Sequence, residues 1–216
     1  MTRIEAVIFD LDGTLVDSVA DLHVATNLML RDAGLAPLSE VETRGFVGNG
    51  VGALTRRALA HRGSADDPAP HAARLIEHYA AAPAARTRPY PGVREMLAGL
   101  SLPIGICTNK PEAQTRQVLR ALELEDMFDV VVGGDTLPVL KPDPAPLRHA
   151  MAALGAPGKG TLFVGDSEVD EATAKTVDVS FALFSGGYRK RPVAEFSADL
   201  AFDDFASLTE WISARL

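Results

Sequence analysis

Cysteine is almost absent from this sequence of 216 residues. The single one, Cys107, cannot form a disulfide within the chain, and no cysteine or histidine pattern has the spacing of zinc ligands. Cys107 lies inside an apolar run, where we expect a buried and chemically inert side chain. A chain without disulfides is typical of a reducing compartment, so we expect a cytoplasmic protein.

Long apolar runs are also missing. No stretch reaches the roughly 18 apolar residues that a membrane-spanning helix needs. The first residues acquire acids at Glu5 and Asp10 before an apolar run like that of a secretion signal develops. These absences predict a soluble protein that has no membrane partner.

Positive charge is in deficit, because 21 lysines and arginines face 29 acidic residues, which gives a net charge of −8. Such a surface repels a long phosphate polymer, so we expect no nucleic acid as a partner. A small anion can still bind where a few cations converge. With 47% hydrophobic residues, the chain is long enough for one large domain or a domain with a smaller insertion.

Short apolar runs predict the strands of a sheet, and they cover residues 6–9, 104–107, 130–132, 162–164 and 179–184. Because these runs are continuous, we expect strands buried on both faces, as in a parallel sheet. Helical periodicity follows at 112–122, 144–154 and 168–177, and 199–216 reads as a last strand and a closing helix. This alternation predicts a doubly wound α/β fold.

Residues 16–85 break this alternation. They contain helical stretches at 17–33, 39–46, 51–62 and 69–81, no convincing strand, and no lysine. A helical block inserted after the first strand predicts a separate cap. We therefore expect a core domain formed by residues 1–15 and 86–216, a cap formed by residues 16–85, and linkers at 15–18 and 83–91.

Polar residues follow the predicted strands, where the carboxyl ends of parallel strands bind ligands. They are Asp10, Asp12, Thr108, Asn109, Lys110, Asp166 and, in a loop, Lys141. Carboxylates are the ligands that Mg²⁺ prefers. The hydroxyl, amide and ammonium groups suit the oxygens of a phosphoryl group. A basic run at 188–191 is a further candidate for attracting an anion, whereas the five histidines show no ligand spacing.

These motifs resemble those of the haloacid dehalogenase-like superfamily. Residues 9–18 (FDLDGTLVDS) are similar to its first motif, 108–111 (TNKP) to its second, Lys141-Pro142 to its third, and 165–170 (GDSEVD) to its fourth. The four motifs follow in the family's order and cover essentially the whole chain. The helix after Asp170 departs from the family pattern, because it ends in Val177-Asp178 rather than in alanine and glycine.

The resemblance implies a Rossmann-like core, a helical cap and an aspartyl-phosphate intermediate. It makes Asp10 the nucleophile and Asp12 the general acid and base. Thr108, Asn109 and Lys141 would hold the phosphoryl oxygens, and Lys141 would also be catalytic. Mg²⁺ would be bound by the carboxylate of Asp10, the main-chain carbonyl of Asp12, and Asp166, with Asp170 supporting them.

Within the superfamily, residues 44–50 (RGFVGNG), 108–111 and 141–147 are most similar to the phosphoglycolate phosphatases. This similarity implies a Mg²⁺-dependent phosphatase of a small phosphorylated metabolite, 2-phosphoglycolate. Such a substrate carries a carboxylate, and the cap loop offers two candidate ligands for it. Arg44 is the nearest cation, and the glycines on either side of Asn49 let main-chain N–H groups approach a ligand. The alternative is that Arg44 is a solvated helix residue and the glycines only form a turn.

Other activities of the superfamily compete with this interpretation. Sugar phosphatase, β-phosphoglucomutase, pyrophosphatase and nucleotidase activities stay open. The second carboxylate, Asp12, disfavours a dehalogenase, and a cap without lysine disfavours Schiff-base chemistry. Because the nucleophile Asp10 is present, a binding module without turnover is also disfavoured. We expect a monomer or a homodimer.

Overall fold

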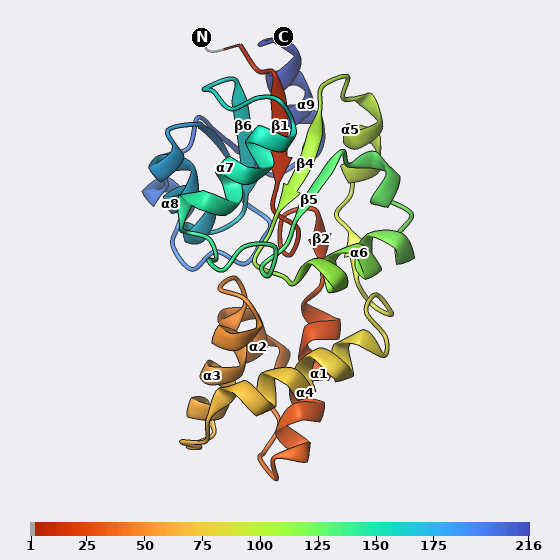
Figure 1. The fold of residues 1–216 in the computed structure, drawn as a ribbon, viewed down its shortest axis with the longest axis vertical. Coiled ribbons are helices and arrows are strands. Elements are labelled where there is room, and N and C mark those ends of the chain that lie inside the picture. The colour runs from red at the N-terminus through yellow and green to blue at the C-terminus, as the bar shows by residue number, and fades with distance from the viewer. Residues whose placement is uncertain (1–2) are drawn as a thin grey trace.

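A six-stranded sheet forms the centre of the larger part of the molecule (Figure 1). The computed structural model describes residues 3–216, so the predicted core segment 1–15 begins with two residues outside the described part. In spatial order the strands are β5 (Val130–Val132), β4 (Ile104–Cys107), β1 (Ala6–Phe9), β6 (Thr161–Gly165), β7 (Ser180–Phe184) and β8 (Leu200–Phe202). All neighbouring pairs are parallel, which confirms the predicted doubly wound sheet.

Helices cover both faces of this sheet. Helices α7 (Pro144–Ala153) and α8 (Glu168–Val177) pack on one face, and α5 (Val93–Gly99) and α9 (Phe205–Ser213) share the core of the other. A further helix, α6 (Glu112–Ala121), packs beside β5. The side chains of β1 alternate between the two cores, because successive residues of a strand point to opposite faces. Each face of the central strand is therefore buried, as its continuous apolar run indicates.

Four helices form a second body at one end of the molecule (Figure 1). They are α1 (Val19–Asp32), α2 (Glu40–Phe46), α3 (Val51–His61) and α4 (Pro68–Ala80). Local signals fix their starts: Ser39 and Glu42 form a reciprocal capping box at α2, and Asp67 caps α4 ahead of Pro68. Helix α1 packs against α4 and α2, and α3 packs against α4. This body is the helical cap that the sequence predicts.

The chain passes between core and cap at two crossings, and the segments at these crossings pair with each other. Strand β2 (Val16–Asp17) lies antiparallel to β3 (Arg88–Pro89), so the expectation of no strand within residues 16–85 is wrong at its first two residues. A two-residue strand pairing with a segment about 70 positions away has no local signal to reveal it. The carboxylate of Asp21 accepts hydrogen bonds from the main chain at Arg86 and Thr87, which ties the crossings further. The predicted domain boundaries stay a prediction.

The end of α8 takes an unusual conformation. Asp178 has a φ of 64°, in the left-handed region that glycine adopts without strain. This is the position where the sequence departs from the family pattern. The departure therefore costs conformational energy at the helix end and leaves Asp170, two turns earlier, in its capping box.

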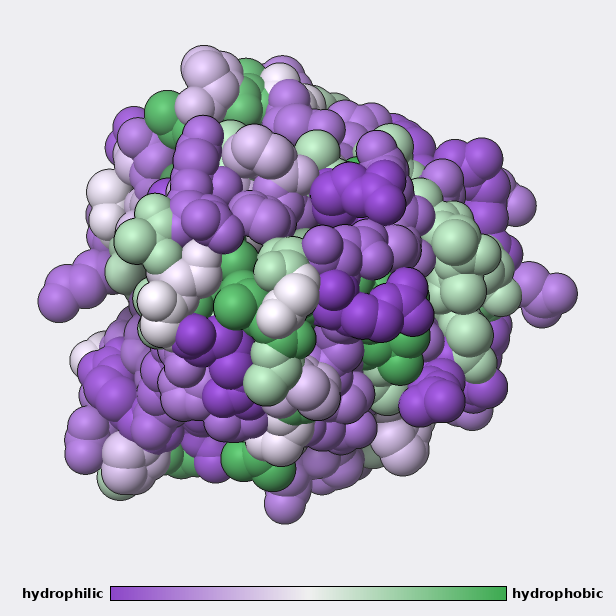
Figure 2. Space-filling model, turned by 90° about the horizontal axis from the view of Figure 1, so that it is seen from below, coloured by the Kyte–Doolittle hydropathy of each residue, from purple (hydrophilic) through white to green (hydrophobic). Residues whose placement is uncertain are grey.

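The outer surface is mainly polar. Seen from the cap end (Figure 2), hydrophilic residues dominate and hydrophobic ones form small, separate groups. In the part of the chain that the structure describes, no helix has both the length and the apolar character needed to cross a membrane.

Candidate active site

The first candidate carboxylate stands where β1 leaves the sheet. The Oδ1 atom of Asp10 accepts a hydrogen bond of 2.8 Å from the main-chain N–H of Leu11, which orients it over the strand end. The chain then turns at Gly13, whose φ is +86°. A Cβ atom there would lie 2.6 Å from Oδ2 of Asp166. The turn therefore requires glycine for both its conformation and its closeness to the second strand end.

Three carboxylates meet at this edge of the sheet. Asp10, Asp166 and Asp170 each offer an oxygen, and these oxygens lie within 4.8 Å of one another. The ammonium of Lys141 is 2.7 Å from Asp170 and 3.1 Å from Asp10. Three carboxylates against this one ammonium leave two negative charges uncompensated within the cluster. Hard oxygen ligands with that excess charge fit a divalent cation such as Mg²⁺.

The pKa values of the cluster reflect the same crowding. Burial, followed by the neighbouring carboxylates of Asp170 and Asp10, raises the pKa of Asp166 well above its usual value. Burial also raises the pKa of Asp10 to about 6, with Lys141 opposing the shift. For Lys141 burial acts to lower the pKa, but the adjacent carboxylates outweigh it and keep the ammonium charged. A bound cation would relieve the repulsion that these shifts express.

Neighbouring groups hold two of these carboxylates in place. Asp166 accepts hydrogen bonds from the hydroxyl of Thr14 at 2.9 Å and the main-chain N–H of Tyr188 at 2.5 Å. Asp170 accepts from the N–H and hydroxyl of Ser167, at 3.1 and 2.7 Å, in the capping box of α8. The expected metal ligands Asp10, Asp166 and Asp170 thus come together, and coordination by the main-chain carbonyl of Asp12 stays a prediction.

Asp12 is held apart from this cluster by a different partner. Both of its oxygens lie 3.1–3.2 Å from the ammonium of Lys110, and Oδ1 also accepts a hydrogen bond of 2.5 Å from Ser18. Lys110 is one of the polar residues that the sequence places at this edge of the sheet, but the TNKP motif indicates no individual role for it. The ring of Tyr79, on α4 of the cap, lies 4.2 Å from the same ammonium. The general acid of the predicted mechanism is therefore positioned by a lysine that also contacts the cap.

The two residues before Lys110 play unequal parts. Thr108 is buried and lines the pocket described below. The side chain of Asn109 bonds within the protein: its Nδ2 donates to the carbonyls of Gly48 and Lys141, and its Oδ1 accepts from the N–H of Lys141. Asn109 thereby joins the lysine loop of the core to the cap. Binding of the phosphoryl oxygens by Asn109 stays a prediction.

A pocket lined by side chains of both bodies lies between core and cap. The core supplies its polar lining, which is Asp10, Asp12, Thr108, Asn109, Lys110 and Gln114. The cap supplies Tyr79 and mainly aliphatic side chains, which are Leu22, Val47, Val51, Leu54, Leu75 and Ile76. Asp10 and Asp12 therefore face a space that is polar on the core side and mainly apolar on the cap side.

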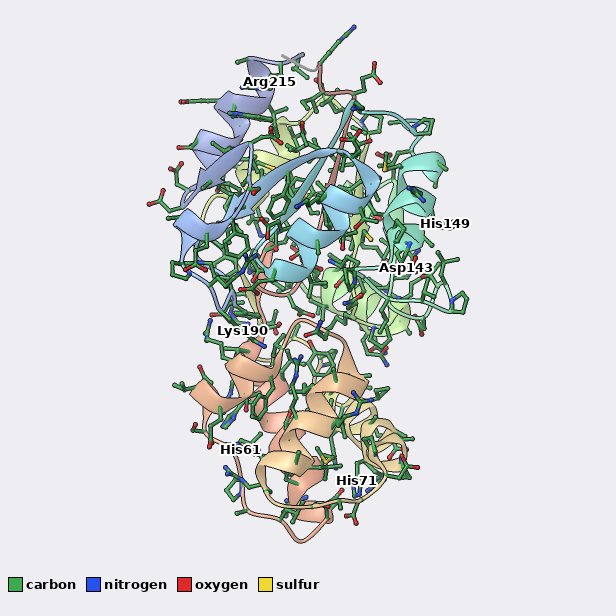
Figure 3. All side chains as sticks on the ribbon, turned by 90° about the vertical axis from the view of Figure 1, so that its left-hand side faces the viewer. His61, His71, Asp143, His149, Lys190 and Arg215 are labelled. Carbon is green, nitrogen blue, oxygen red and sulfur yellow. The ribbon has the colours of Figure 1, made fainter. Side chains whose placement is uncertain are left out.

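A smaller hollow adjoins the same carboxylates. Asn49 and Lys190 contribute to its lining, together with Asp166. Lys190 is exposed and stands at the junction of core and cap (Figure 3), so the basic run expected to attract anions does reach the mouth of the site. His61 and His71 lie on the cap and His149 on the core, away from this junction (Figure 3).

The predicted substrate ligands of the cap have partners of their own. The guanidinium of Arg44 is 3.4 Å from Asp17 and 4.9 Å from the ring centre of Tyr188, and Arg44 does not line the pocket. The side-chain oxygen of Asn49 accepts a hydrogen bond of 2.7 Å from Arg57. The roles of Arg44 and Asn49 in binding the carboxylate stay predictions.

Tyr188 joins the metal cluster to the linker. Its main-chain N–H donates to Asp166, while its hydroxyl donates to Asp17 at 2.7 Å and accepts from the N–H of Ser18 at 2.8 Å. The side chain is buried, and only the aromatic ring of a tyrosine combines this packing with a polar end. No sequence motif pointed to it, since the loop after β7 reaches the site only in the folded sheet.

Comparison with known proteins agrees with this geometry. The family of haloacid dehalogenase-like hydrolases matches residues 7–184. A phosphoglycolate phosphatase of Cereibacter sphaeroides is 50% identical over 193 residues, which are 87% of this chain and 88% of the relative. Another from Rhodospirillum rubrum is 47% identical over 218 residues, covering 96% of this chain and 90% of the relative.

Solved structures show the same fold. A predicted phosphoglycolate phosphatase from Haemophilus somnus superimposes with a TM-score of 0.91 at 32% identity, covering 98% of this chain and 99% of that one. CbbY from Rhodobacter sphaeroides, in complex with phosphate, superimposes with a TM-score of 0.82 at 25% identity and covers 95% and 96%.

The chain therefore belongs to the haloacid dehalogenase-like hydrolases. Within that family it is a phosphatase, the activity by which its relatives are named.

Proposed function

We propose that this phosphatase is Mg²⁺-dependent and hydrolyses 2-phosphoglycolate to glycolate and phosphate through an aspartyl-phosphate on Asp10. The observation that carries the proposal is the position of Asp10. It shares the pocket with Asp12, touches Lys141, and belongs to the three-carboxylate cluster. One side chain thus adjoins a proton donor, a cation and a metal site, as a phosphoryl-accepting nucleophile requires.

In the first half-reaction an oxygen of Asp10 attacks phosphorus, and the bond from phosphorus to the ester oxygen breaks. Asp12 gives its proton to that oxygen as glycolate leaves. Lys141 offsets the negative charge that spreads over the phosphoryl oxygens. Bound Mg²⁺ would add a Lewis acid at those oxygens, held by Asp10, Asp166 and the carbonyl of Asp12, with Asp170 behind them.

In the second half-reaction Asp12 takes a proton from water, which attacks the phosphorus of the aspartyl-phosphate. The bond between phosphorus and Asp10 breaks, which releases phosphate and restores the carboxylate. Ser18 and Lys110 orient Asp12, which lines the same pocket as Asp10, for both proton transfers.

The lining of the pocket favours a small acid over a sugar phosphate. A sugar would place several hydroxyls against the aliphatic side chains of the cap, and buried hydroxyls without partners cost free energy. Glycolate has no hydroxyl left once phosphorylated, and it needs a partner only for its carboxylate. The relatives that match most of this chain carry the name phosphoglycolate phosphatase, which supports the same choice.

A substrate panel tests this proposal. We expect kcat/KM for 2-phosphoglycolate to exceed that for hexose phosphates, nucleotides and pyrophosphate by at least about 10-fold, with activity lost in excess EDTA. Asp10→Asn should lower kcat by at least about 100-fold and leave the circular dichroism spectrum unchanged. A sugar phosphate or nucleotide that is turned over as well as 2-phosphoglycolate would refute the substrate assignment, and an active Asp10→Asn enzyme would refute the mechanism.

A further inference from the structure

Lys110 is the one cation among residues 3–216 that lines the large pocket. Its side chain is only 5% exposed, and its ammonium lies against Asp12 on one side and the ring of Tyr79 on another. Burial acts to lower the pKa of Lys110, but the nearby carboxylate of Asp12 opposes burial and the pKa is raised above its usual value. A lysine has three N–H donors, so this ammonium can serve Asp12 and a ligand at once.

Tyr79 supplies a second donor at the same place. Its hydroxyl is buried and has no hydrogen-bond partner among the described residues. Buried tyrosine hydroxyls nearly always have one, so an unpaired one that lines a pocket indicates a place for a polar ligand atom. Lys110 comes from the core and Tyr79 from α4 of the cap, so the pair spans the junction of the two bodies.

We propose that Lys110 and Tyr79 together bind the carboxylate of the substrate, and that they restrict the enzyme to acids whose carboxylate is attached to the carbon that bears the phosphate. This assignment rests on the proposed function. It assigns the binding of the substrate's carboxylate to a buried pair of residues that line the pocket. Arg44 is not assigned this role, because its guanidinium contacts Asp17 outside the pocket.

The distances within the site match those within the substrate. The leaving oxygen must lie within hydrogen-bond reach of Asp12, roughly 2.7 Å, to receive its proton. The ammonium of Lys110 lies 3.1 Å from an oxygen of the same carboxylate. In 2-phosphoglycolate the carboxylate carbon is two bonds from that leaving oxygen. A substrate this short can therefore place its leaving oxygen at Asp12 and its carboxylate toward Lys110.

A pair of substrates isolates this contact from the chemistry. 2-Hydroxyethyl phosphate has the same chain length as 2-phosphoglycolate but carries no carboxylate. We expect Lys110→Met to lower the ratio of kcat/KM for phosphoglycolate over hydroxyethyl phosphate by at least about 10-fold, the loss of one charge-assisted contact. Both absolute rates will fall, because Lys110 also positions Asp12, but that loss cancels in the ratio. Tyr79→Phe, which keeps the ring, should lower the ratio by a smaller factor.

Two further variants serve as matched controls. Arg44→Ala and Lys190→Met each remove one positive charge near the site, and we expect the ratio to stay within about 2-fold of the wild-type value. An unchanged ratio in both Lys110→Met and Tyr79→Phe overturns the proposal. A fall of the ratio in Arg44→Ala or Lys190→Met alone overturns it as well and assigns the carboxylate to that cation.

Binding of an unreactive analogue separates this proposal from the proposed function. The probes are 3-phosphonopropionate and propylphosphonate, with and without a carboxylate, used as inhibitors of p-nitrophenyl phosphate turnover. We expect the wild type to bind the carboxylate form at least about 10-fold more tightly and Lys110→Met to lose this preference, even if another acid proves the better substrate. A wild-type enzyme without the preference refutes the subsite, whereas a preference combined with poor 2-phosphoglycolate hydrolysis refutes only the proposed function.

Discussion

The buried ammonium of Lys141 offers the sharpest test of the electrostatic reasoning. Its side chain is 1% exposed and lies 2.7 Å from Asp170 and 3.1 Å from Asp10. Lys141→Met keeps the aliphatic length and removes the charge, so three buried carboxylates lose the cation they share. Removing one partner of a buried ion pair costs about 3–5 kcal/mol of unfolding free energy. In a domain of this size that corresponds to a fall in Tm of roughly 10 °C.

The loss should depend on pH in a defined direction. The folded-state pKa of Asp10 is raised from 3.8 to about 6, so its protonation stabilises the fold below pH 3.8 and this stabilisation disappears as the pH rises through 6. Lys141 opposes that shift, so removing Lys141 moves the protonation of Asp10 to higher pH. The loss of unfolding free energy in Lys141→Met should therefore be greatest near pH 7.5, where the carboxylates are charged, and should shrink as the pH falls to 5.

The assay is urea unfolding in EDTA at pH 7.5 and at pH 5. Lys159→Met is the matched control, because its ion pair with Asp178 is exposed and is worth at most about 1 kcal/mol. Two results would refute the reasoning that Lys141 relieves repulsion among the buried carboxylates. One is a Lys141→Met protein that is as stable as Lys159→Met, and the other is a loss of unfolding free energy that does not change with pH.

Further predictions concern the metal, the helix ends and the linker. Saturating Mg²⁺ at about 100 times its Kd should add about 2.7 kcal/mol of stability, measured by thermal unfolding, and Asp166→Ala should abolish this gain. In a Lys159→Met background, which already lacks the ion pair with Asp178, Asp178→Gly should stabilise the protein by about 1 kcal/mol in urea, since glycine removes the left-handed strain, and a destabilised variant would contradict this. The N–H of Ser39, followed by His61, lowers the pKa of Glu42 to about 2, so the carboxylate of Glu42 stabilises the fold above pH 4.5 and this stabilisation is lost toward pH 2. In thermal melts, Glu42→Gln should be less stable than the parent protein at pH 7 and equally stable near pH 2. Tyr188→Phe should cost about 1–3 kcal/mol in urea unfolding, because it leaves buried N–H groups at the linker unpaired, and a neutral effect would show that water replaces the hydroxyl.

Local patterns decided most of the secondary structure. The strands at 6–9, 104–107 and 130–132 agree with the apolar runs, because a strand buried on both faces must be apolar at every position. Asp204 caps the last helix, because its side chain accepts a hydrogen bond from the N–H of Ser207. The pair β2 and β3 escaped detection, since its strands are too short to carry a period and pair only through the fold.

The sequence by itself determined which carboxylates are candidates for the site. Asp10 and Asp12 stand two residues apart around a strand end, and Asp166 and Asp170 lie four residues apart on either side of the start of α8, so short-range geometry brings each pair to the site. Only the tertiary structure decided how the charges are shared. Lys110 meets Asp12 across 98 positions of sequence. Tyr79 reaches Lys110 from the cap, and Arg44 turns to Asp17 instead of the pocket. Side chains interact only when the fold brings them within a few ångströms of each other. The separation of two residues along the chain does not indicate whether the fold does so.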